Sequence, residues 1–282
     1  MNETPIDPIA IALLEDVGAG DITTESFVPE GLHGLGRIIV RERAIVAGGQ
    51  TAAEVFRRVN PNLHVELLQP DGTALMGGET ILEVRGLTRS ILTAERVALN
   101  FLQHLTGVAT LTRQFVDAIG KSRAQILDTR KTSPGLRALE KAAVIAGGGA
   151  NHRSHLNEMV LLKDNHLSVG TGLSEITSAI KRLRQKRPDI QIEVEVERLE
   201  QVHTFLQLEG VNTILLDNMK PSEMREAVAL GRNKVKFEAS GGVNLKNVRQ
   251  IAATGVDYIS VGALTHSARA IDMSLELTNV GG

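Results

Sequence analysis

Basic side chains are concentrated in one stretch of this slightly acidic chain. The stretch reads DTRKTSPGLRALEKAAVIAGGGANHRSHLNEMVLLKDNH, whereas all 282 residues together carry a formal net charge of -2. Arginine presents a planar fork that matches a carboxylate, and lysine adds a compact charge. Arg130, Lys131, Arg153 and Lys163 therefore predict a site for an anion, and His152 adds a donor near neutral pH.

The alternative interpretation of these charges is a solvated basic loop. It is disfavoured because GGGANHR and LLKDNH place the charges beside glycine-rich or apolar sequence. Arg137 and Lys141 lie in the predicted helix LRALEKAAV near Glu140, and we interpret them as ordinary surface charges. His155 and His166 receive no role, and no histidine pair has the H-E-x-x-H arrangement of a zinc site.

Polar residues or glycine also end each of six short runs rich in Ile, Leu and Val. The runs are AQILDT, MVLLK, IQIEVEV, NTILLD, VKFEAS and DYISVG. The residues at or just after their ends are Thr129, Arg130, Lys131, Lys163, Glu195, Asp217, Ser240 and Gly262. A single one of these could be a helix cap or a loop residue. In a parallel barrel, however, all strand ends meet at the face that carries the active site.

Two carboxylates, Glu195 and Asp217, follow neighbouring runs. Beside an anion pocket they would bind hydroxyl groups or a hard cation, and Mg²⁺ commonly combines one or two carboxylates with substrate phosphates. A general acid and base pair is the alternative role.

Glycines follow the last two runs, in ASGGVN (Ser240, Gly241, Gly242) and SVGALTHS (Gly262, Ala263). Glycine allows backbone N–H groups to approach an anion at a helix N-terminus, and the last strand loops of barrels commonly hold a phosphate. We therefore expect the 5′-phosphate of a sugar phosphate at this side. The alternative is that these glycines only form tight turns.

Alternation of strand-like runs with amphipathic segments predicts parallel βα units in the second part of the chain. Six clear units favour an open, incomplete α/β barrel of six or seven strands, with a doubly wound sheet as the alternative. Before them, helical spacing over residues 6–17 and short β-like runs with turns predict an N-terminal α/β domain. We place the boundary at an interruption near Gly107, which gives domains 1–107 and 108–282.

Composition limits the class of protein. Apolar residues make up 42% and aromatic residues only 2%, which predicts a soluble globular protein with an aliphatic core. The absence of cysteine excludes disulfides and thiolate chemistry. The apolar runs are shorter than a membrane span, the start lacks the basic region of a secretory signal, and the balanced charge disfavours nucleic acid. We expect a cytoplasmic enzyme without nucleic-acid or membrane partners.

Together these motifs closely resemble the quinolinate phosphoribosyltransferase family, also called carboxylating nicotinate-nucleotide diphosphorylases. The resemblance rests on LDTRKTSPGLRALEKAAVIAGGGANHR, LLKDNHL, EVEVE, LLDNM, EASGGVN, DYISVGALTHSA and TAERVALNFLQHLTGVAT, in family order. It implies an N-terminal α/β sandwich before the open barrel. It also implies transfer of phosphoribose from phosphoribosyl pyrophosphate to quinolinate with Mg²⁺, releasing pyrophosphate, carbon dioxide and nicotinate mononucleotide in NAD biosynthesis.

The resemblance further assigns expected roles to individual residues. Arg130, Arg153 and Lys163 are similar to the quinolinate ligands, with Thr129, Lys131 and His152 in the same pocket. Glu195 and Asp217 resemble the ribose and metal carboxylates, and Ser240, Gly241, Gly242, Gly262 and Ala263 the phosphate loops. Arg96 resembles an arginine that enters the neighbouring subunit's pocket, which implies a homodimer with shared sites, or a hexamer built from such dimers. We include Lys131, Lys163, Glu195 and Asp217 as the expected catalytic residues.

One position departs from the family pattern, since His155 in NHRSHL stands where the family usually has glycine. A molybdenum-transport-associated relative of the same fold is the alternative function. A non-catalytic binding module, the third reading, is disfavoured because a binder needs no metal-competent carboxylates beside an anion pocket.

Overall fold

The computed structural model describes residues 7–163 and 172–279, which form two compact units. The first unit comprises residues 1–113, 132–148 and 264–282, and the second comprises residues 114–131 and 149–263. Both units are thus discontinuous in sequence, whereas the sequence suggested a single division at residue 107. Among the described helices, none combines the length and the apolar character that crossing a membrane requires.

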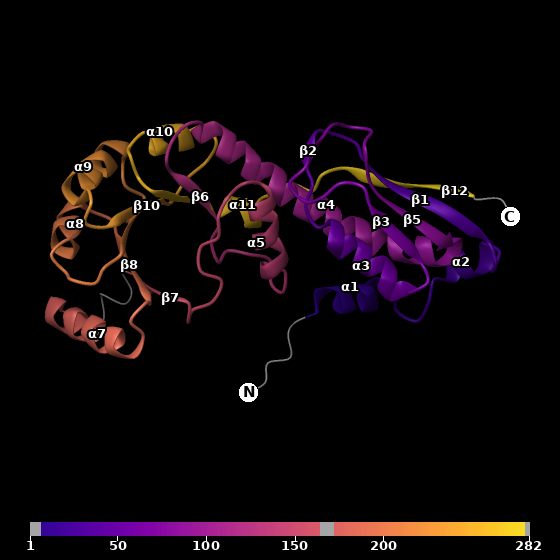
Figure 1. Cartoon of the computed structure of the whole chain (residues 1–282), viewed down its shortest axis with the longest axis horizontal. Coiled ribbons are helices and arrows are strands. Elements are labelled where there is room, and N and C mark those ends of the chain that lie inside the picture. The colour runs from indigo at the N-terminus through magenta and orange to yellow at the C-terminus, as the bar shows by residue number, and fades with distance from the viewer. Residues whose placement is uncertain (1–6, 164–171, 280–282) are drawn as a thin grey trace. The chain divides into compact units, whose positions relative to one another are not determined.

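The first unit is built on an antiparallel sheet that joins the two ends of the chain. Its strands follow the order β12-β1-β5-β3, and in Figure 1 the yellow β12 lies beside the indigo β1. The strands are β1 (His33–Val40), β3 (His64–Leu67), β5 (Thr80–Leu87) and β12 (Met273–Asn279), with a small pair β2 (Ala44–Ile45) and β4 (Ala74–Leu75). Apolar residues of β1 and β5, such as Ile38, Val40, Leu82 and Val84, pack with helix residues in one core.

Two of the helices in this unit begin at side-chain caps. The helices are α1 (Pro8–Val17), α2 (Ile22–Phe27), α3 (Gly49–Val59), α4 (Thr88–Ile119), α5 (Arg137–Ala146) and the short α11 (Ala263–His266) at the junction with the second unit. Asp7 and Asp21 accept hydrogen bonds from the backbone N–H groups of Ala10 and Thr24, at 3.0 and 2.9 Å. Each thereby satisfies an N–H group that the first helical turn leaves without a partner.

Helix α4 is continuous through Gly107, so the interruption that the sequence suggested there is wrong. A Cβ atom at this position would lie 2.1 Å from the backbone oxygen of Arg269. Glycine is therefore required by close backbone packing within the first unit, and not by a break in the helix.

The second unit is the open barrel that the sequence predicted. Its sheet has six strands in the order β6-β11-β10-β9-β8-β7, and every pairing is parallel. The strands are β6 (Gln125–Leu127), β7 (Met159–Leu162), β8 (Gln191–Val196), β9 (Thr213–Asp217), β10 (Lys236–Ser240) and β11 (Tyr258–Ser260). Within the described residues, β6 and β7 form the two edges and do not pair with each other.

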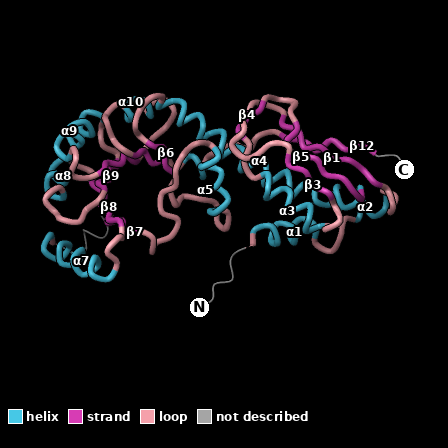
Figure 2. Tube along the Cα trace, in the orientation of Figure 1, coloured by secondary structure: helices cyan, strands magenta, loops and turns pink. Residues whose placement is uncertain are grey.

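Helices connect these strands and lie on the outer side of the sheet, as Figure 2 shows. They are α7 (Leu173–Lys186), α8 (Leu199–Phe205), α9 (Pro221–Gly231) and α10 (Val248–Ala252). Buried side chains such as Ile176, Val202 and Met224 face the strands. Because each strand is followed by a returning helix, all six strands run the same way and their carboxyl ends lie at one rim.

Candidate active site

A cavity of about 620 Å³ lies at the carboxyl ends of these strands. It is lined by Thr129, Arg130, Lys131, His152, Arg153, Leu161, Lys163, Glu195, Leu215, Asp217, Asn218, Glu238, Ser240, Gly241, Gly242 and Ser260. Side chains two residues apart on a strand share a face, so Leu215 and Asp217, and likewise Glu238 and Ser240, point to the same side. All the lining residues belong to the second compact unit.

Most of the predicted site residues are among those that line the cavity. Gly262 and Ala263 follow β11 but do not line it, and Arg96 lies exposed on α4 in the other compact unit. His166 lies outside the described residues.

One end of the cavity gathers positive charge. Burial and then the neighbouring charge of Arg130 lower the pKa of Arg153, whose Nη1 donates a hydrogen bond to the backbone oxygen of Met159 at 2.9 Å. Lys131 and Lys163 line the same cavity. Placing like charges together is unfavourable unless an anion separates them, so this end is suited to a carboxylate-bearing ligand.

Two carboxylates occupy the rim beside the cations. Glu195 Oε2 lies 2.5 Å from Lys163 Nζ, and Asp217 Oδ2 accepts a hydrogen bond of 2.8 Å from the Asn218 side chain. Asn218 has a φ of 53°, and its backbone N–H bonds to the oxygen of Ser240 at 2.9 Å. The loops after β9 and β10 are therefore held against each other.

The glycine turn after β10 has a steric reason for its sequence. Gly241 and Gly242 have φ values of 88° and 61°, in the left-handed region that other residues rarely adopt. A Cβ atom on Gly241 would lie 2.2 Å from Asn218 Oδ1. Asn244 and Asn247 each donate a 3.0 Å hydrogen bond to the oxygen of Gly242, which holds the turn open toward the cavity.

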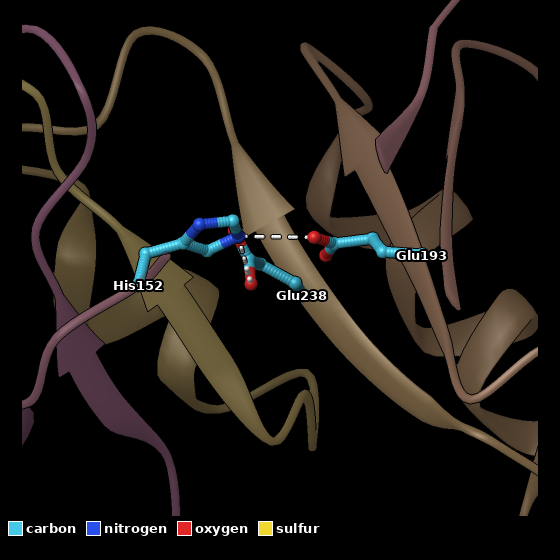
Figure 3. Close-up of side chains that lie close together, drawn as sticks. All are labelled: His152, Glu193 and Glu238. Carbon is cyan, nitrogen blue, oxygen red and sulfur yellow. Dashed lines mark hydrogen bonds and ion pairs between the residues drawn. The ribbon is translucent and has the colours of Figure 1, made fainter. Parts of the chain in front are cut away.

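A buried cluster below the rim was missed by the sequence analysis. His152 Nε2 lies 2.9 Å from Glu193 Oε2 and 3.8 Å from Glu238 Oε2, and Figure 3 shows the ring pointing toward both carboxyl groups. Ser260 Oγ donates a hydrogen bond to Glu238 Oε1. Glu193 and Glu238 are only 1% and 2% exposed. The available signal was their position: each is a charged residue directly flanked by two apolar residues in a strand-like run.

The ring of His152 has a defined tautomer. The backbone N–H of Arg153 donates to His152 Nδ1 at 2.9 Å, so that nitrogen must carry the lone pair. The proton of the neutral ring is then on Nε2, which faces Glu193. The backbone N–H of His152 itself donates to the buried Asp128 Oδ1 at 2.9 Å. The sequence analysis expected His152 to offer a donor to the ligand, but its Nε2–H group points to Glu193 inside the protein.

The same tautomer bears on whether the cluster is a metal site. One ligand atom from each of His152, Glu193 and Glu238 lies within 4.8 Å of the others, a spacing that a cation could use. A nitrogen that carries hydrogen cannot coordinate a metal, and Nε2 is the nitrogen that faces the carboxyl groups. We therefore interpret the cluster as a hydrogen-bonded group.

Burial has a strong effect on both carboxyl groups of the cluster. Burial raises the pKa of Glu193 to about 7. A hydrogen bond from Glu238 and the positive charge of Arg153 lower this pKa, but their effect is smaller than that of burial. Burial also raises the pKa of Glu238 to about 8, with the charge of Glu193 as the next cause. Two adjacent carboxyl groups in a low-dielectric environment cannot both ionise readily, so the pair retains a proton near neutral pH.

Outside the cavity, the first unit contains a further buried carboxylate, on a helix whose basic residues the sequence analysis had placed at the surface. Glu140 accepts hydrogen bonds from His104 Nε2 at 2.8 Å and from the backbone N–H of Ser133 at 3.0 Å. Lys141, interpreted above as a surface charge, is only 3% exposed, so that prediction is wrong. Arg137 donates to Thr132 Oγ1 at 3.0 Å and is half-buried. Helix α5 therefore buries charged side chains that its sequence placed at the surface.

An open parallel barrel with an anion pocket at its strand ends defines a class of sugar-phosphate enzyme, and comparison with known proteins specifies it. The quinolinate phosphoribosyl transferase C-terminal domain matches residues 108–276, and the corresponding N-terminal domain matches residues 21–106. The chain belongs to the quinolinate phosphoribosyltransferase family. It is a pentosyltransferase that forms a nicotinate nucleotide with decarboxylation, and the molybdenum-associated alternative is not favoured.

Individual relatives are similar over nearly the whole chain. The carboxylating nicotinate-nucleotide pyrophosphorylase of Mycobacterium leprae is 42% identical, with 96% of each chain covered. A decarboxylating quinolinate phosphoribosyltransferase of Nicotiana tabacum is 40% identical over 95% of this chain and 81% of the relative. The solved structure of NadC from Streptococcus pyogenes is 36% identical, covers both chains completely and superimposes with a TM-score of 0.91. The nicotinate-nucleotide pyrophosphorylase of Francisella tularensis is 37% identical with a TM-score of 0.88, over 96% and 94% of the chains.

Proposed function

We propose that the cavity at the strand ends is where phosphoribose passes from phosphoribosyl pyrophosphate to the ring nitrogen of quinolinate. One observation carries this assignment: a cluster of cations and a pair of carboxylates with a glycine turn line a single cavity. Quinolinate is a dianion and suits the cations. The sugar phosphate has hydroxyl and phosphate groups, which suit the carboxylates and the turn.

Quinolinate would bind at the basic end. Arg130 and Arg153 supply forks for its two carboxylates, and Lys163 and Lys131 add charge. Thr129 accepts the backbone N–H of Lys131 at 3.0 Å, which supports the loop that carries both basic residues. His152 acts from below, because its backbone and ring bonds hold the segment that leads into Arg153.

Phosphoribosyl pyrophosphate would occupy the other end. Glu195 and Asp217 are placed to accept hydrogen bonds from ribose hydroxyl groups. The backbone of Ser240, Gly241 and Gly242 is placed for the 5′-phosphate. Gly262 and Ala263 extend this region after the next strand in sequence, although they do not line the cavity itself.

The carboxylates also suit magnesium. Glu195 and Asp217 offer hard oxygen ligands on neighbouring strands, and both remain partly exposed, as a metal that keeps water and phosphate ligands requires. When bound with the substrate, the ion would stabilise the charge on departing pyrophosphate. To bind the ion, Glu195 would release its ion pair with Lys163. Lys163 would then be available to bind quinolinate.

The chain's own residues account for the transfer by position and charge. Departure of pyrophosphate leaves cationic character on the ribose, which Glu195 and Asp217 stabilise. Arg130 and Arg153 orient the pyridine ring so that its nitrogen faces the ribose carbon. After the new bond forms, the ring nitrogen is positively charged. That charge stabilises the electron pair left on the adjacent carbon when carbon dioxide departs.

A homodimer with shared sites is part of the proposal. Arg96 is exposed on α4 and absent from the cavity lining of its own chain, which leaves it available to a second copy. Helices α1 and α2 expose Leu14, Ile22 and Phe27, an apolar surface of the kind that subunit contacts cover. A hexamer of such dimers and a cytoplasmic location remain predictions, which light scattering and cell fractionation would check.

A direct assay tests the reaction. The protein is incubated with quinolinate, phosphoribosyl pyrophosphate and Mg²⁺, and nicotinate mononucleotide and pyrophosphate are measured together. Equal amounts of the two products are expected, and omission of quinolinate should abolish both. Failure to form the nucleotide in the complete mixture would refute the proposal.

A further inference from the structure

The decarboxylation creates a chemical demand that the rim residues do not meet. When carbon dioxide leaves, the electron pair of the broken C–C bond stays on C2 of the pyridine ring, beside the quaternised nitrogen. A proton must be added to that carbon before the product is nicotinate mononucleotide. The chain therefore needs an acid within the cavity, an inference that rests on the proposed function.

Several groups in the cavity carry protons, but most are engaged in other contacts. His152 is neutral, its Nε2 proton is directed to Glu193, and its Nδ1 lone pair is directed to the Arg153 N–H. Lys163 is paired with Glu195 at 2.5 Å in the absence of substrate, and in the proposed complex it instead binds a quinolinate carboxylate. Arginine does not give up a proton in proteins. Glu238 differs, because it is a carboxyl group that lines the cavity and yet is almost completely buried.

We propose that the Glu238 carboxyl group delivers the proton that C2 of the pyridine ring takes up after carbon dioxide leaves. Glu238 is on β10, two residues before Ser240, so it lies on the cavity face one pleat below the rim. Ser260, from the neighbouring strand β11, also lines the cavity and holds one carboxyl oxygen through a hydrogen bond. The group thus has a fixed orientation at the cavity floor.

The surroundings of Glu238 keep it in the acid form. Glu193 and His152 face it, and Ser260 and Tyr258 on β11 and Leu215 on β9 flank it. Among the described residues, no lysine or arginine forms an ion pair with Glu238; the neutral ring of His152 approaches it through Nε2, at 3.8 Å. A buried carboxyl group beside a second one, without a cation, is neutral at physiological pH. A neutral acid also avoids repelling a dianionic substrate.

The step balances without an oxidant or reductant. The bond between C2 and the carboxylate carbon breaks, carbon dioxide leaves, and its bonding electrons remain on C2. The proton of Glu238 bonds to C2, and Glu238 becomes a carboxylate next to Glu193. When the product leaves and water enters the cavity, Glu238 takes a proton from solvent and the cycle can repeat.

The test separates protonation from phosphoribosyl transfer. Glu238→Gln preserves shape and hydrogen bonding but has no acidic proton. In a single-turnover rapid-quench experiment, pyrophosphate should appear with its wild-type amplitude, while quinolinate mononucleotide accumulates. Nicotinate mononucleotide should form more slowly by on the order of 10²-fold, the usual contribution of a general acid. Glu238→Asp, which retains the acid on a shorter side chain, should recover part of the rate.

Glu193→Gln is the matched control, because it makes the same exchange in the same buried cluster without removing the proposed donor. In this variant, pyrophosphate and nicotinate mononucleotide should form at the same rate as each other. The proposal is overturned if Glu238→Gln forms nicotinate mononucleotide at the wild-type rate. It is also overturned if both products slow together in the Gln and Asp variants alike. A wild-type protein that makes no nicotinate mononucleotide would instead contradict the assigned function.

Discussion

Lys163 Nζ and Glu195 Oε2 lie 2.5 Å apart, so the proposed quinolinate ligand and the proposed ribose ligand bind each other when substrates are absent. Substrate binding must exchange this contact. Glu195→Gln should therefore tighten quinolinate binding while it lowers activity, because Lys163 no longer has a competing carboxylate. A partly exposed pair contributes about 0.2–1 kcal/mol, which is a gain in affinity of up to about fivefold.

Titration calorimetry with quinolinate alone measures this effect. Asp217→Asn is the matched control, since Asp217 is on the neighbouring strand and its carboxylate accepts a hydrogen bond from the Asn218 side chain. Its quinolinate affinity should stay unchanged. Weaker binding in Glu195→Gln would show that the carboxylate supports Lys163 in its binding position and does not compete for it.

Arg153→Lys should not be a conservative substitution. A lysine cannot reproduce both the fork toward a substrate carboxylate and the 2.9 Å bond to the backbone of Met159. Loss of one side of a buried charge pair costs about 2–5 kcal/mol of quinolinate binding. Phosphoribosyl pyrophosphate, at the other end, should bind normally, as separate calorimetric titrations would reveal.

Arg187→Lys is the matched control for that variant. Arg187 also donates to a backbone oxygen, that of Asn157, at 2.7 Å, but it does not line the active-site cavity. This variant should bind quinolinate as the wild type does. Normal quinolinate binding by Arg153→Lys would remove Arg153 from the ligand set.

Nicotinate should be a very poor substrate. It has one carboxylate, so it would leave part of the cluster of Arg130, Arg153 and Lys163 without an anion. Sites built to bind a polar group reject analogues that lack it by roughly 10⁴-fold in kcat/KM. Steady-state assays with each acid measure the ratio, and similar values for the two would contradict the assignment of the basic end.

Two inactive variants should restore activity together if Arg96 enters the partner's site. Arg96→Ala and Asp217→Ala are each expected to be inactive as homodimers. In a mixed dimer, one site receives both lesions and the other receives neither. Random association makes about half the dimers mixed, so about a quarter of all sites should be intact.

Co-refolding the two variants and measuring nicotinate mononucleotide formation tests this, with subunit exchange confirmed by a mass label. Each variant refolded alone is the control. If exchange occurs and no activity returns, Arg96 acts in its own chain or in neither site.

Stability should fall as pH rises because of Glu238. Burial raises its pKa from 4.5 to about 8, so the folded protein keeps a proton that the unfolded chain loses. Its contribution is fully present below about pH 4.5 and is lost as the pH approaches 8. Glu238→Gln cannot ionise and should flatten this dependence by on the order of 5 kcal/mol, since one pKa unit is worth about 1.4 kcal/mol.

Urea unfolding across that pH range measures the slope. Glu140→Gln is the control: burial raises the pKa of Glu140, but the bonds from His104 and Ser133 outweigh it and leave the pKa lowered. Its contribution therefore changes only in acid below the ordinary carboxyl value. A steep slope that persists in Glu238→Gln would place the retained proton elsewhere.

The local sequence determined the positions of the strands in the second unit. Each of the six apolar runs is a strand, and the polar residues that end the first five runs line the cavity at the rim, because parallel strands separated by helices must end on one side. Short-range chemistry also predicted the glycine turn at Gly241. These features follow from periodicity and turn preference, which depend on neighbours in the chain.

Tertiary structure alone decided the features that depend on residues far apart. Gly107 permits the backbone of Arg269 to approach α4, where the sequence suggested an interruption. Glu193 and Glu238 become one proton-sharing pair because β8 and β10 bring them beneath the same cavity, and His152 takes its tautomer from the Arg153 N–H and the Glu193 carboxyl group. Burial and hydrogen bonding set these charges, and both are properties of the packed chain that no local pattern contains.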